Sequence, residues 1–325
     1  MGFFVAEKFL FLYDIVMKEY KNILVIKLGA LGDFIQKTGC YAAIRKNWPN
    51  AKITLLTGRA FLKIAQSSGC FDAYVEDNRT WCPLDYIRII RMLVGNKYDL
   101  IIDLQMQRRT KERYYALTRL WANHSFDWAS FTRGAFFIRH ILDKPRCLWG
   151  KSSESQLKLD IPPASLAFCK ASPDVLALLP QQYVLLIPGC SPAHPYKRWP
   201  AASYRELALR LGKMDIPSVV LGTSAEQKEI ETICSDNPKA INFCNKSALL
   251  DIPQIAAQSM AIVGNDTGPQ HMAELGSVHA VTLFCEVTKK SAIYRPNITN
   301  LFGKEITDIS VDAVFNVLQS LWHKA

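Results

Sequence analysis

The chain has 325 residues, of which 49% are apolar and 21% are charged. This length predicts two domains of ordinary size or one large one, and the composition is typical of a globular protein with a substantial core. No apolar run is long enough to span a bilayer without charges. The nine cysteines form no C-x-x-C pair and no Cys/His cluster at metal-ligand spacing. That pattern favours reduced thiols in a cytoplasmic protein over a zinc site or a disulfide framework.

The positive charge is confined to the first half of the chain. Residues 1–160 hold 25 lysines and arginines against 15 acidic residues, whereas 161–325 hold 14 of each, so the net charge of +10 lies in the first half. Its densest part contains Arg108, Arg109 and Lys111. A one-sided basic domain predicts an anionic partner, either nucleic acid, anionic lipid or a phosphorylated glycolipid. The alternative is a solvated helix face. Nucleic acid is the weakest partner, because no recognition module is present.

Residues 1–20 resemble a signal peptide at first sight. Glu7, Lys8 and Asp14 interrupt the apolar run, and no small-residue cleavage site follows. The spacing of apolar residues instead predicts an amphipathic helix. Its apolar face either packs on the domain or rests on a membrane surface.

Strands and helices then alternate along the first half. The β-branched run at 21–28 is typical of a strand covered on both faces. A turn and a helix follow it, and the βαβα order predicts a parallel sheet with crossover helices. The further strands are expected at 51–58, 72–77 and 98–105, and the clearest helices at 34–49 and 86–96.

The alternation stops around 150–180, where Ser clusters and a Pro-Pro pair are typical of a linker. It then resumes with strands at 183–189, 216–222, 261–266 and 280–284 and a terminal helix at 310–325. The sequence therefore predicts an α/β protein with two Rossmann-like, doubly wound domains, 1–165 and 181–325, joined by a linker at 166–180. Two such domains facing each other predict a ligand cleft at the carboxyl ends of their strands. The terminal helix is a candidate to pack back on the first domain.

The stretch GNDTGPQHMAELG, residues 264–276, brings Asp266, Thr267 and Gly268 from the end of a strand to the first turn of a helix. Pro269 suits that turn, because its missing N–H would have no helical partner. The free amides of Thr267 and Gly268, with the helix dipole, predict an anion site, and His271 follows one turn later. The alternative is that Asp266 or Thr267 only caps the helix.

The loop after the strand at 183–189 contains the adjacent cations Lys197 and Arg198. A lysine in a cleft suits a diphosphate. The alternative is a surface pair beside Trp199.

The loop after the strand at 216–222 brings Glu226 to the start of a helix. Its carboxylate either accepts hydrogen bonds from ribose hydroxyls or belongs to a capping box, Thr223 with Glu226 or Ser224 with Gln227. Together with the other two loops, it describes a site for a nucleotide diphosphate.

In the first half, the turn GALGD ends a strand and places Asp33 at a helix start. It is not G-x-G-x-x-G, which disfavours a dinucleotide cofactor. Asp33 is either a general base or an N-cap with Gln36 as its partner. The chain contains no D-x-D pair to hold a metal-bound diphosphate, so no metal is expected, and Lys197 and the helix amides would neutralise a leaving group alone.

The motifs ILVIKLGALGDFIQKTG, PGCSPAHPYKRWP, LGTSAEQKEI and GNDTGPQHMAELG, in this order, resemble glycosyltransferase family 9, whose members include ADP-heptose:lipopolysaccharide heptosyltransferases. The resemblance covers roughly residues 21–290. It implies the GT-B fold, with acceptor on the first domain and donor on the second, and inversion at the anomeric carbon without a metal or other cofactor.

Carried over to this chain, the resemblance implies a role for each motif residue. Asp33 would be the base, Lys197 the diphosphate ligand and Glu226 the ribose carboxylate. The donor phosphate and sugar would be bound by Asp266, Thr267, Gly268 and His271. The acceptor would be bound on the first domain, at Gly32. Because the positive charge of the chain lies in that domain, Arg108, Arg109 and Lys111 are also candidates to bind an anionic acceptor.

The chain departs from the family at the donor side. LFCEVTKK follows the strand at 280–284, where the family has Gly-Pro-Thr, and GSVHAV stands where the family has a Gly-x-Pro start. The expected function is transfer of heptose, or a related sugar, from ADP-heptose to an anionic glycolipid at the inner face of the cytoplasmic membrane. The alternatives are a hexosyltransferase for another surface polysaccharide and a catalytically silent sugar-nucleotide-binding protein.

Overall fold

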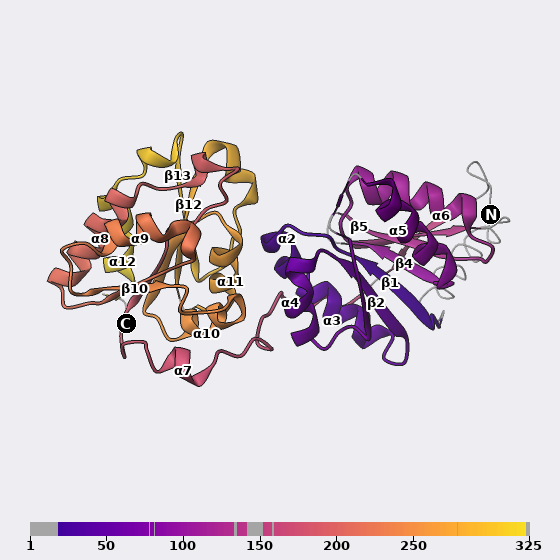
Figure 1. Ribbon diagram of the computed structural model, residues 1–325, viewed down its shortest axis with the longest axis horizontal. Coiled ribbons are helices and arrows are strands. Elements are labelled where there is room, and N and C mark those ends of the chain that lie inside the picture. The colour runs from indigo at the N-terminus through magenta and orange to yellow at the C-terminus, as the bar shows by residue number, and fades with distance from the viewer. Residues whose placement is uncertain are drawn as a thin grey trace, which may run out of the picture. The chain divides into compact units, whose positions relative to one another are not determined.

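Each half of the chain forms its own twisted β-sheet between helices (Figure 1). The computed structural model describes residues 19–77, 79–80, 82–132, 135–141, 152–157, 159–277 and 279–322. The expected amphipathic helix therefore lies almost wholly outside the described residues. The chain divides into two compact units, Met1–Ala164 and Ser165–Ala325.

The first unit contains a seven-stranded sheet in the order β3-β2-β1-β4-β5-β6-β7. Strands β1 to β5 are parallel, as the βαβα pattern predicts. The run Ile23–Ile26 in β1 is fully buried, because helices cover both faces of a central parallel strand. The strands are β1 (Asn22–Ile26), β2 (Lys52–Thr57), β3 (Ala73–Glu76), β4 (Leu100–Asp103), β5 (Asp127–Thr132), β6 (Ala135–Ile141) and β7 (Ser152–Leu157).

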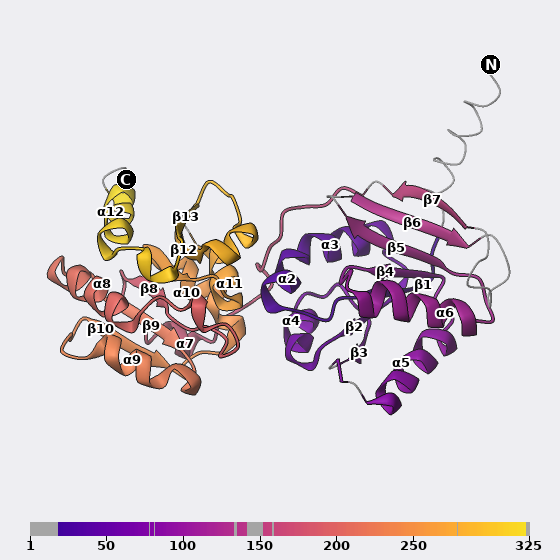
Figure 2. The same cartoon turned by 90° about the horizontal axis from the view of Figure 1, so that it is seen from above.

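The helices of the first unit lie on both faces of this sheet. Helix α3 lies on one face and helices α5 and α6 on the other (Figure 2). The π-helical segment η2 (Arg109–Tyr114) runs directly into α6. The other elements are α2 (Leu31–Gln36), α3 (Thr38–Asn47), η1 (Arg59–Phe61), α4 (Leu62–Ser67), α5 (Pro83–Gly95) and α6 (Tyr115–Trp121).

The sheet of the first unit ends in an antiparallel extension that the sequence does not predict. Strand β6 pairs antiparallel with β5, and β7 pairs antiparallel with β6. The Ser-rich residues 152–157 therefore form an edge strand, and the interpretation of these residues as part of a linker is wrong. Serine is a weak strand former, and the pairing with β6 decides the conformation.

The second unit contains a six-stranded, all-parallel sheet in the order β10-β9-β8-β11-β12-β13. The sequence predicts four of these strands, and the more exposed edge strands β10 and β13 are additional. The strands are β8 (Val184–Ile187), β9 (Ser218–Gly222), β10 (Ala240–Cys244), β11 (Ala261–Asn265), β12 (Ala280–Cys285) and β13 (Ile298–Gly303).

The terminal helix α12 belongs to the core of the second unit. The sequence suggests that this helix packs back on the first unit. In the structure, Val314 and Leu318 are fully buried in the core of the second unit, and Arg210 of α8 lies 2.5 Å from Asp312 of α12. Among the described residues no helix is long and apolar enough to cross a membrane. The helices are α7 (Pro173–Leu176), η3 (Pro195–Lys197), α8 (Ala201–Lys213), η4 (Ser224–Glu226), α9 (Gln227–Cys234), η5 (Leu249–Asp251), α10 (Ile252–Ala257), α11 (Gly268–Gly276), η6 (Glu286–Ser291), η7 (Ile306–Asp308) and α12 (Val311–Trp322).

The strand order brings three loops of the second unit together. Strand β8 lies between β9 and β11, so the loops that follow these three strands start at neighbouring points of one sheet edge. The order reverses at β8, which is the position where doubly wound sheets bind ligands. The loops are those that contain Lys197, Glu226 and Asp266.

Candidate functional site

An ion pair joins two of these loops. Lys197 ends η3, and Asp266 directly follows β11. The Lys197 ammonium lies 2.7 Å from Oδ2 of Asp266, whose side chain is 4% exposed, while that of Lys197 is 20% exposed. The carboxylate is thus buried and the ammonium remains partly open to solvent. This pairing leaves a cation at the edge of the sheet, where an anionic ligand can reach it.

His271, in the first turn of α11, contacts the oxygen of Asp266 that Lys197 does not. Its Nε2 is 3.0 Å from Oδ1 of Asp266, and its Nδ1 is 2.9 Å from Oε2 of Glu274. Burial alone opposes protonation of the imidazole, but the hydrogen bonds to the two carboxylates outweigh it and raise the pKa of His271 to about 9. Burial likewise disfavours the charged form of Asp266, but His271 and Lys197 hold its pKa below its ordinary value. The site therefore alternates positive and negative charge.

A layer of neutral side chains supports the imidazolium. The Thr282 hydroxyl donates to Oε1 of Glu274 at 2.6 Å, and Gln270 Nε2 donates to Thr282 Oγ1 at 2.9 Å. Gly264 makes room for this chain of bonds, because a Cβ there would lie 2.2 Å from Oε1 of Gln270. Sequence reasoning assigns no role to Thr282, Gln270 or Gly264. Among the residues described, no group of three or more His, Cys, Asp or Glu side chains is placed to hold a metal ion.

Asn265 fixes the loop that carries Lys197. Its side chain is fully buried, accepts hydrogen bonds from Trp199 N and the Tyr204 hydroxyl at 3.1 Å each, and donates to Pro188 O at 2.7 Å. Both ends of the 188–199 loop are therefore bonded to the last residue of β11. Sequence reasoning assigns Asn265 no role; the signal available is a polar residue that ends a buried strand directly before Asp266.

The amino end of α11 has no side-chain cap. Thr267 occupies the N-cap position with an extended backbone, but no side chain caps the helix there. The Asp266 carboxylate is held by Lys197 and His271, and Thr267 Oγ1 is a buried atom without a hydrogen-bond partner among the described residues. The capping hypothesis for Asp266 and Thr267 is therefore wrong. First-turn amides lack helical acceptors, so the N–H groups of Thr267 and Gly268 have the geometry to bind an anion beside Lys197.

The adjacent cations Lys197 and Arg198 have different partners. Arg198 forms an ion pair with Glu229 and donates to Cys190 O at 3.1 Å. The structure therefore brings Lys197, and not Arg198, to Asp266. Trp199 is buried, and its indole N–H donates to Ile309 O at 2.8 Å. The hypothesis of a surface pair is wrong for Lys197.

Glu226 does form the Thr223 capping box. Its Oε2 accepts from Thr223 N at 3.0 Å and from the Thr223 hydroxyl at 2.6 Å. None of the described residues donates to the other oxygen, Oε1. A Cβ on Gly189, in the loop after β8, would lie 3.4 Å from the Glu226 carboxyl carbon, so the two loops are in contact. Capping therefore leaves Oε1 of Glu226 without a donor among the described residues, next to the loop after β8.

Asp33 is the third residue of α2, after Gly32, and is exposed. The N-cap is Ala30, so the hypothesis that Asp33 is the N-cap is wrong. Its carboxylate makes no hydrogen bond or ion pair with the described residues. Gly29 precedes the helix at φ +127°, and a Cβ there would lie 2.6 Å from the Phe61 ring, so this turn requires glycine.

Lys27 is a buried cation near Asp33 that sequence reasoning misses. It follows β1 and is 3% exposed. Burial lowers its pKa, and the charge of Asp33 acts in the opposite direction. Asp103, fully buried on β4 in register with Ile26, has a pKa raised by burial. The available signal is a lysine directly after the apolar run Ile23–Ile26.

The structure separates the three basic residues expected to bind the acceptor. Arg108 is exposed and lies 3.0 Å from Glu112. Arg109 is largely buried, lies 3.1 Å from the buried carboxylate of Asp77, and stacks on the Tyr86 ring at 4.3 Å. Lys111 is exposed and has no ion-pair partner among the described residues. Only Lys111 therefore keeps a charge that is free of internal partners.

Comparisons with known proteins identify the family and the fold. The model of the family described as glycosyltransferase family 9 (heptosyltransferase) matches residues 86–305. Solved structures of similar fold include E. coli heptosyltransferase WaaC with ADP-2-deoxy-2-fluoro heptose, at a TM-score of 0.63 and 17% identity over 92% of this chain and 99% of that chain. A glycosyl transferase family 9 protein from Veillonella parvula gives 0.67 and 18% over 95% and 99%.

A third similar structure is E. coli ADP-heptose lps heptosyltransferase II, at 0.62 and 16% identity over 94% of this chain and 100% of that chain. A comparison with curated proteins finds no match. The fold is thus the GT-B architecture of two Rossmann-like units. The family match spans more than half of the chain and includes the three loops around Lys197, Glu226 and Asp266. The chain therefore belongs to glycosyltransferase family 9 and is a glycosyltransferase.

Proposed function

We propose that this glycosyltransferase moves a heptose, or a closely related sugar, from ADP-heptose to a lipopolysaccharide inner-core or lipid A-type acceptor. The family description and the heptosyltransferases of similar fold support the choice of sugar. One of those proteins, E. coli heptosyltransferase WaaC, was solved with ADP. The excess of positive charge in residues 1–160 supports an anionic acceptor bound to the first unit at the cytoplasmic face of a membrane.

The observation that carries the proposal is the uncapped amino end of α11 beside the Lys197 ammonium. Amides of a helix first turn and a partly exposed lysine are the donors that a diphosphate needs. Glu226 supplies an acceptor oxygen for ribose hydroxyls from the neighbouring loop. The donor's leaving group is thus held by the second unit.

In the proposed reaction, Asp33 takes the proton of an acceptor hydroxyl. The acceptor oxygen forms a bond to the anomeric carbon of the donor from the side opposite the diphosphate. The bond between that carbon and the diphosphate oxygen breaks, and its electron pair stays on the diphosphate. A single displacement of this kind inverts the anomeric configuration.

Lys197 and the amides of Thr267 and Gly268 stabilise the charge that develops on the departing diphosphate. Such preorganised donors act in the transition state without reorganisation. Since these groups are positive or dipolar, the proposal needs no metal ion and no other cofactor. His271, as an imidazolium, keeps the Asp266 carboxylate ionised and oriented toward Lys197.

The test is calorimetry of the full chain with ADP, UDP and GDP, in EDTA and in magnesium. The proposal expects preference for ADP and equal affinity in both buffers. A requirement for magnesium, or preference for UDP or GDP, would contradict it. NMR of the product formed from ADP-heptose and a lipid A-type acceptor then checks inversion of the anomeric centre.

A second candidate is transfer of a hexose to another surface polysaccharide. It is favoured by the segment after β12, where η6 (Glu286–Ser291) replaces the Gly-Pro-Thr that the resemblance leads one to expect. Strand β12 adjoins β11, so this change borders the donor site. A panel of ADP-, UDP- and GDP-sugars separates the two candidates, and absence of any transfer would favour a silent sugar-nucleotide-binding protein.

A further inference from the structure

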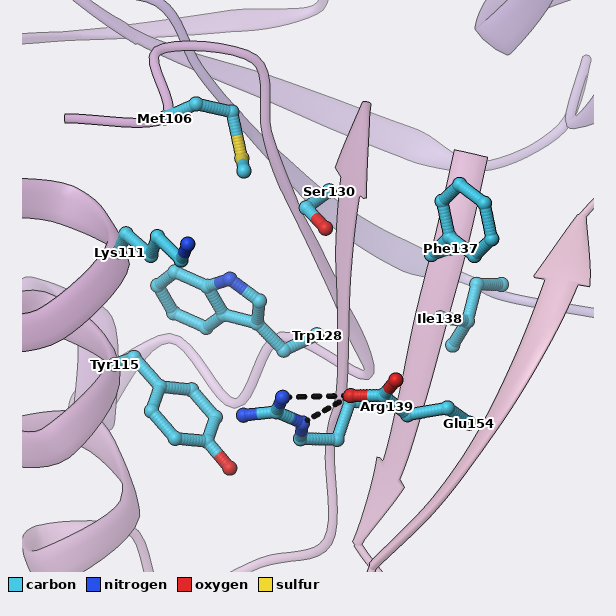
Figure 3. A pocket seen from close by; sticks show the side chains of 9 residues that line it. All are labelled: Met106, Lys111, Tyr115, Trp128, Ser130, Phe137, Ile138, Arg139 and Glu154. Carbon is cyan, nitrogen blue, oxygen red and sulfur yellow. Dashed lines mark hydrogen bonds and ion pairs between the residues drawn. The ribbon is translucent and has the colours of Figure 1, made fainter. Parts of the chain in front are cut away.

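A cavity of about 450 Å³ in the first unit is not used by the donor site or by Asp33 (Figure 3). It opens over strands β5, β6 and β7, and Lys111 of η2 reaches it from the other side. Its volume falls within the range of roughly 300–1,000 Å³ that small-molecule sites occupy. The residues that decide its chemistry are Lys111, Trp128, Ser130, Phe137, Arg139 and Glu154.

Strand register places five of these side chains on one face of the sheet. Trp128 of β5 is paired with Arg139 of β6, which is paired with Glu154 of β7. Ser130 and Phe137 form the next same-face pair, because side chains alternate with a period of two. The antiparallel extension therefore forms the floor of the cavity, with the rings of Trp128 and Phe137 and the charged side chains of Arg139 and Glu154.

The charges that line the cavity do not cancel. Arg139 donates from Nε and Nη2 to Oε1 of Glu154, at 3.0 and 2.6 Å, so this pair is neutral. The second oxygen of Glu154 has no partner among the described residues. Lys111 adds a cation that no described carboxylate pairs with. The cavity thus has one uncompensated positive charge and a free carboxylate oxygen.

Two further polar groups of the cavity lack partners. Trp128 is only 6% exposed, yet none of the described residues accepts a hydrogen bond from its indole N–H. Figure 3 shows this nitrogen and the Lys111 ammonium on the same side of the cavity. The Ser130 hydroxyl also has no partner among the described residues. A ligand hydroxyl in the cavity would accept from the indole N–H and bond the Ser130 hydroxyl in place of water.

We propose that this cavity binds a sugar ring with an anionic substituent, a carboxylate or a phosphate, as part of the acceptor. A sugar ring has apolar C–H faces that pack on the Trp128 and Phe137 rings. Its hydroxyls meet the indole N–H, the Ser130 hydroxyl and the free oxygen of Glu154. The anionic group pairs with Lys111. That this sugar belongs to the acceptor rests on the proposed function, whereas binding of a free sugar does not.

The test titrates the full chain with glucuronate, glucose 6-phosphate and glucose, followed by saturation-transfer NMR and calorimetry. The two anionic sugars should bind about tenfold more tightly than glucose, because one charge-assisted contact is worth about 1.4 kcal/mol. Lys111→Gln should remove that difference and leave glucose unchanged. Lys213→Gln, an exposed lysine of α8 in the second unit, is the matched control and should change nothing. Whichever anion loses more affinity in Lys111→Gln identifies the carboxylate or the phosphate as the natural group.

Glu154→Gln and Trp128→Phe should weaken all three sugars about threefold to tenfold, which is the loss of one hydrogen bond. Glu154 is an exposed side chain, so its variant tests the cavity even if Trp128→Phe unfolds. Unchanged sugar affinity in Lys111→Gln and Glu154→Gln would overturn the proposal. Weaker ADP binding in these variants would also overturn it, since the cavity would then belong to the donor.

The Asp33→Asn variant separates this inference from the proposed function. It should bind the sugars as the wild type does while turnover is lost. Sugar binding with undiminished turnover in Asp33→Asn would refute the role of Asp33 and leave the cavity assignment standing. Normal dependence on Asp33 without any sugar binding would refute the cavity alone.

Discussion

The Lys197 ammonium lies 2.7 Å from a carboxylate oxygen of Asp266, although the residues are 69 positions apart in the chain. Lys197→Met should therefore weaken ADP binding about 10- to 100-fold, since a hydrogen bond to a charged group is worth about 1.5–3 kcal/mol. AMP, which lacks the second phosphate, should lose less. Arg198→Met removes the neighbouring cation that pairs with Glu229, and ADP affinity should survive. Equal losses in both variants, measured by calorimetry, would contradict a specific role for Lys197.

Thr267→Val tests the uncapped helix end. The Thr267 hydroxyl has no partner among the described residues, so the variant should keep its melting temperature within about 2 °C. We expect bound phosphates to take up this unpaired hydroxyl as a further donor, so ADP affinity should fall about fivefold in the variant. Thr267→Ser keeps the hydroxyl and should bind as the wild type does. A large loss of stability with unchanged ADP affinity would show a purely structural role.

His271 predicts a loss of stability at high pH. Its pKa is raised to about 9 in the folded protein, from an ordinary value near ~6.5, by Asp266 and Glu274. The stabilisation is complete below the unfolded pKa and is lost as the pH rises through about 9. Its size is at most ~3.5 kcal/mol, at about 1.4 kcal/mol for each pKa unit.

Chemical denaturation between pH 6.5 and 10 measures this effect. The free energy of unfolding of the wild type should fall over that interval, and His271→Gln should fall much less. His194→Gln, an exposed histidine of the same unit, should keep the wild-type slope. Parallel slopes for wild type and His271→Gln would exclude a charged His271.

Asp33→Asn should lower kcat by about 10²- to 10⁴-fold, the usual contribution of a general base. The Asp33 carboxylate makes no bond with the described residues, so the melting temperature should not change. ADP affinity should also be kept. Steady-state kinetics with saturating donor give kcat, and a variant that retains more than half of it would exclude Asp33 as the base.

Arg109 and Arg108 should behave differently when neutralised. Arg109→Met leaves the buried Asp77 carboxylate without its ion pair, which should destabilise the first unit by about 3–5 kcal/mol. Arg108→Met removes an exposed i,i+4 pair with Glu112, worth about 0.3–0.5 kcal/mol. Thermal unfolding distinguishes them. Similar melting temperatures for both variants would refute the structural role of Arg109.

Much of the fold can be predicted from local patterns. The apolar runs that give β1, β8 and β11 are fully buried parallel strands, and a short continuous apolar run between turns is typical of such a strand. Strand β7 could not be predicted, because Ser152–Leu157 has little intrinsic preference for a strand and depends on its partner β6. Strands at the sheet edges bury less, so their sequences show weaker patterns.

The residues of the sequence motifs could be predicted, but the residues that hold them in place by hydrogen bonds could not. The motif around Asp266 predicts the uncapped helix end, and the structure places Lys197 beside it. Asn265 and Glu274 act through hydrogen bonds to residues far apart in the chain, and no local spacing encodes such contacts. The same holds for Arg109, whose partner Asp77 lies 32 positions earlier. A basic cluster in sequence therefore says little about which cations are free.

Because Asn265 bonds both ends of the loop that carries Lys197, the sheet itself shapes that loop. Its conformational entropy is lost when the second unit folds and is not lost again when a nucleotide sugar arrives. Recognition of the diphosphate should then require little local reordering. A change at Asn265 would accordingly act like a change in the ligand's concentration, by reducing the fraction of molecules that are ready to bind.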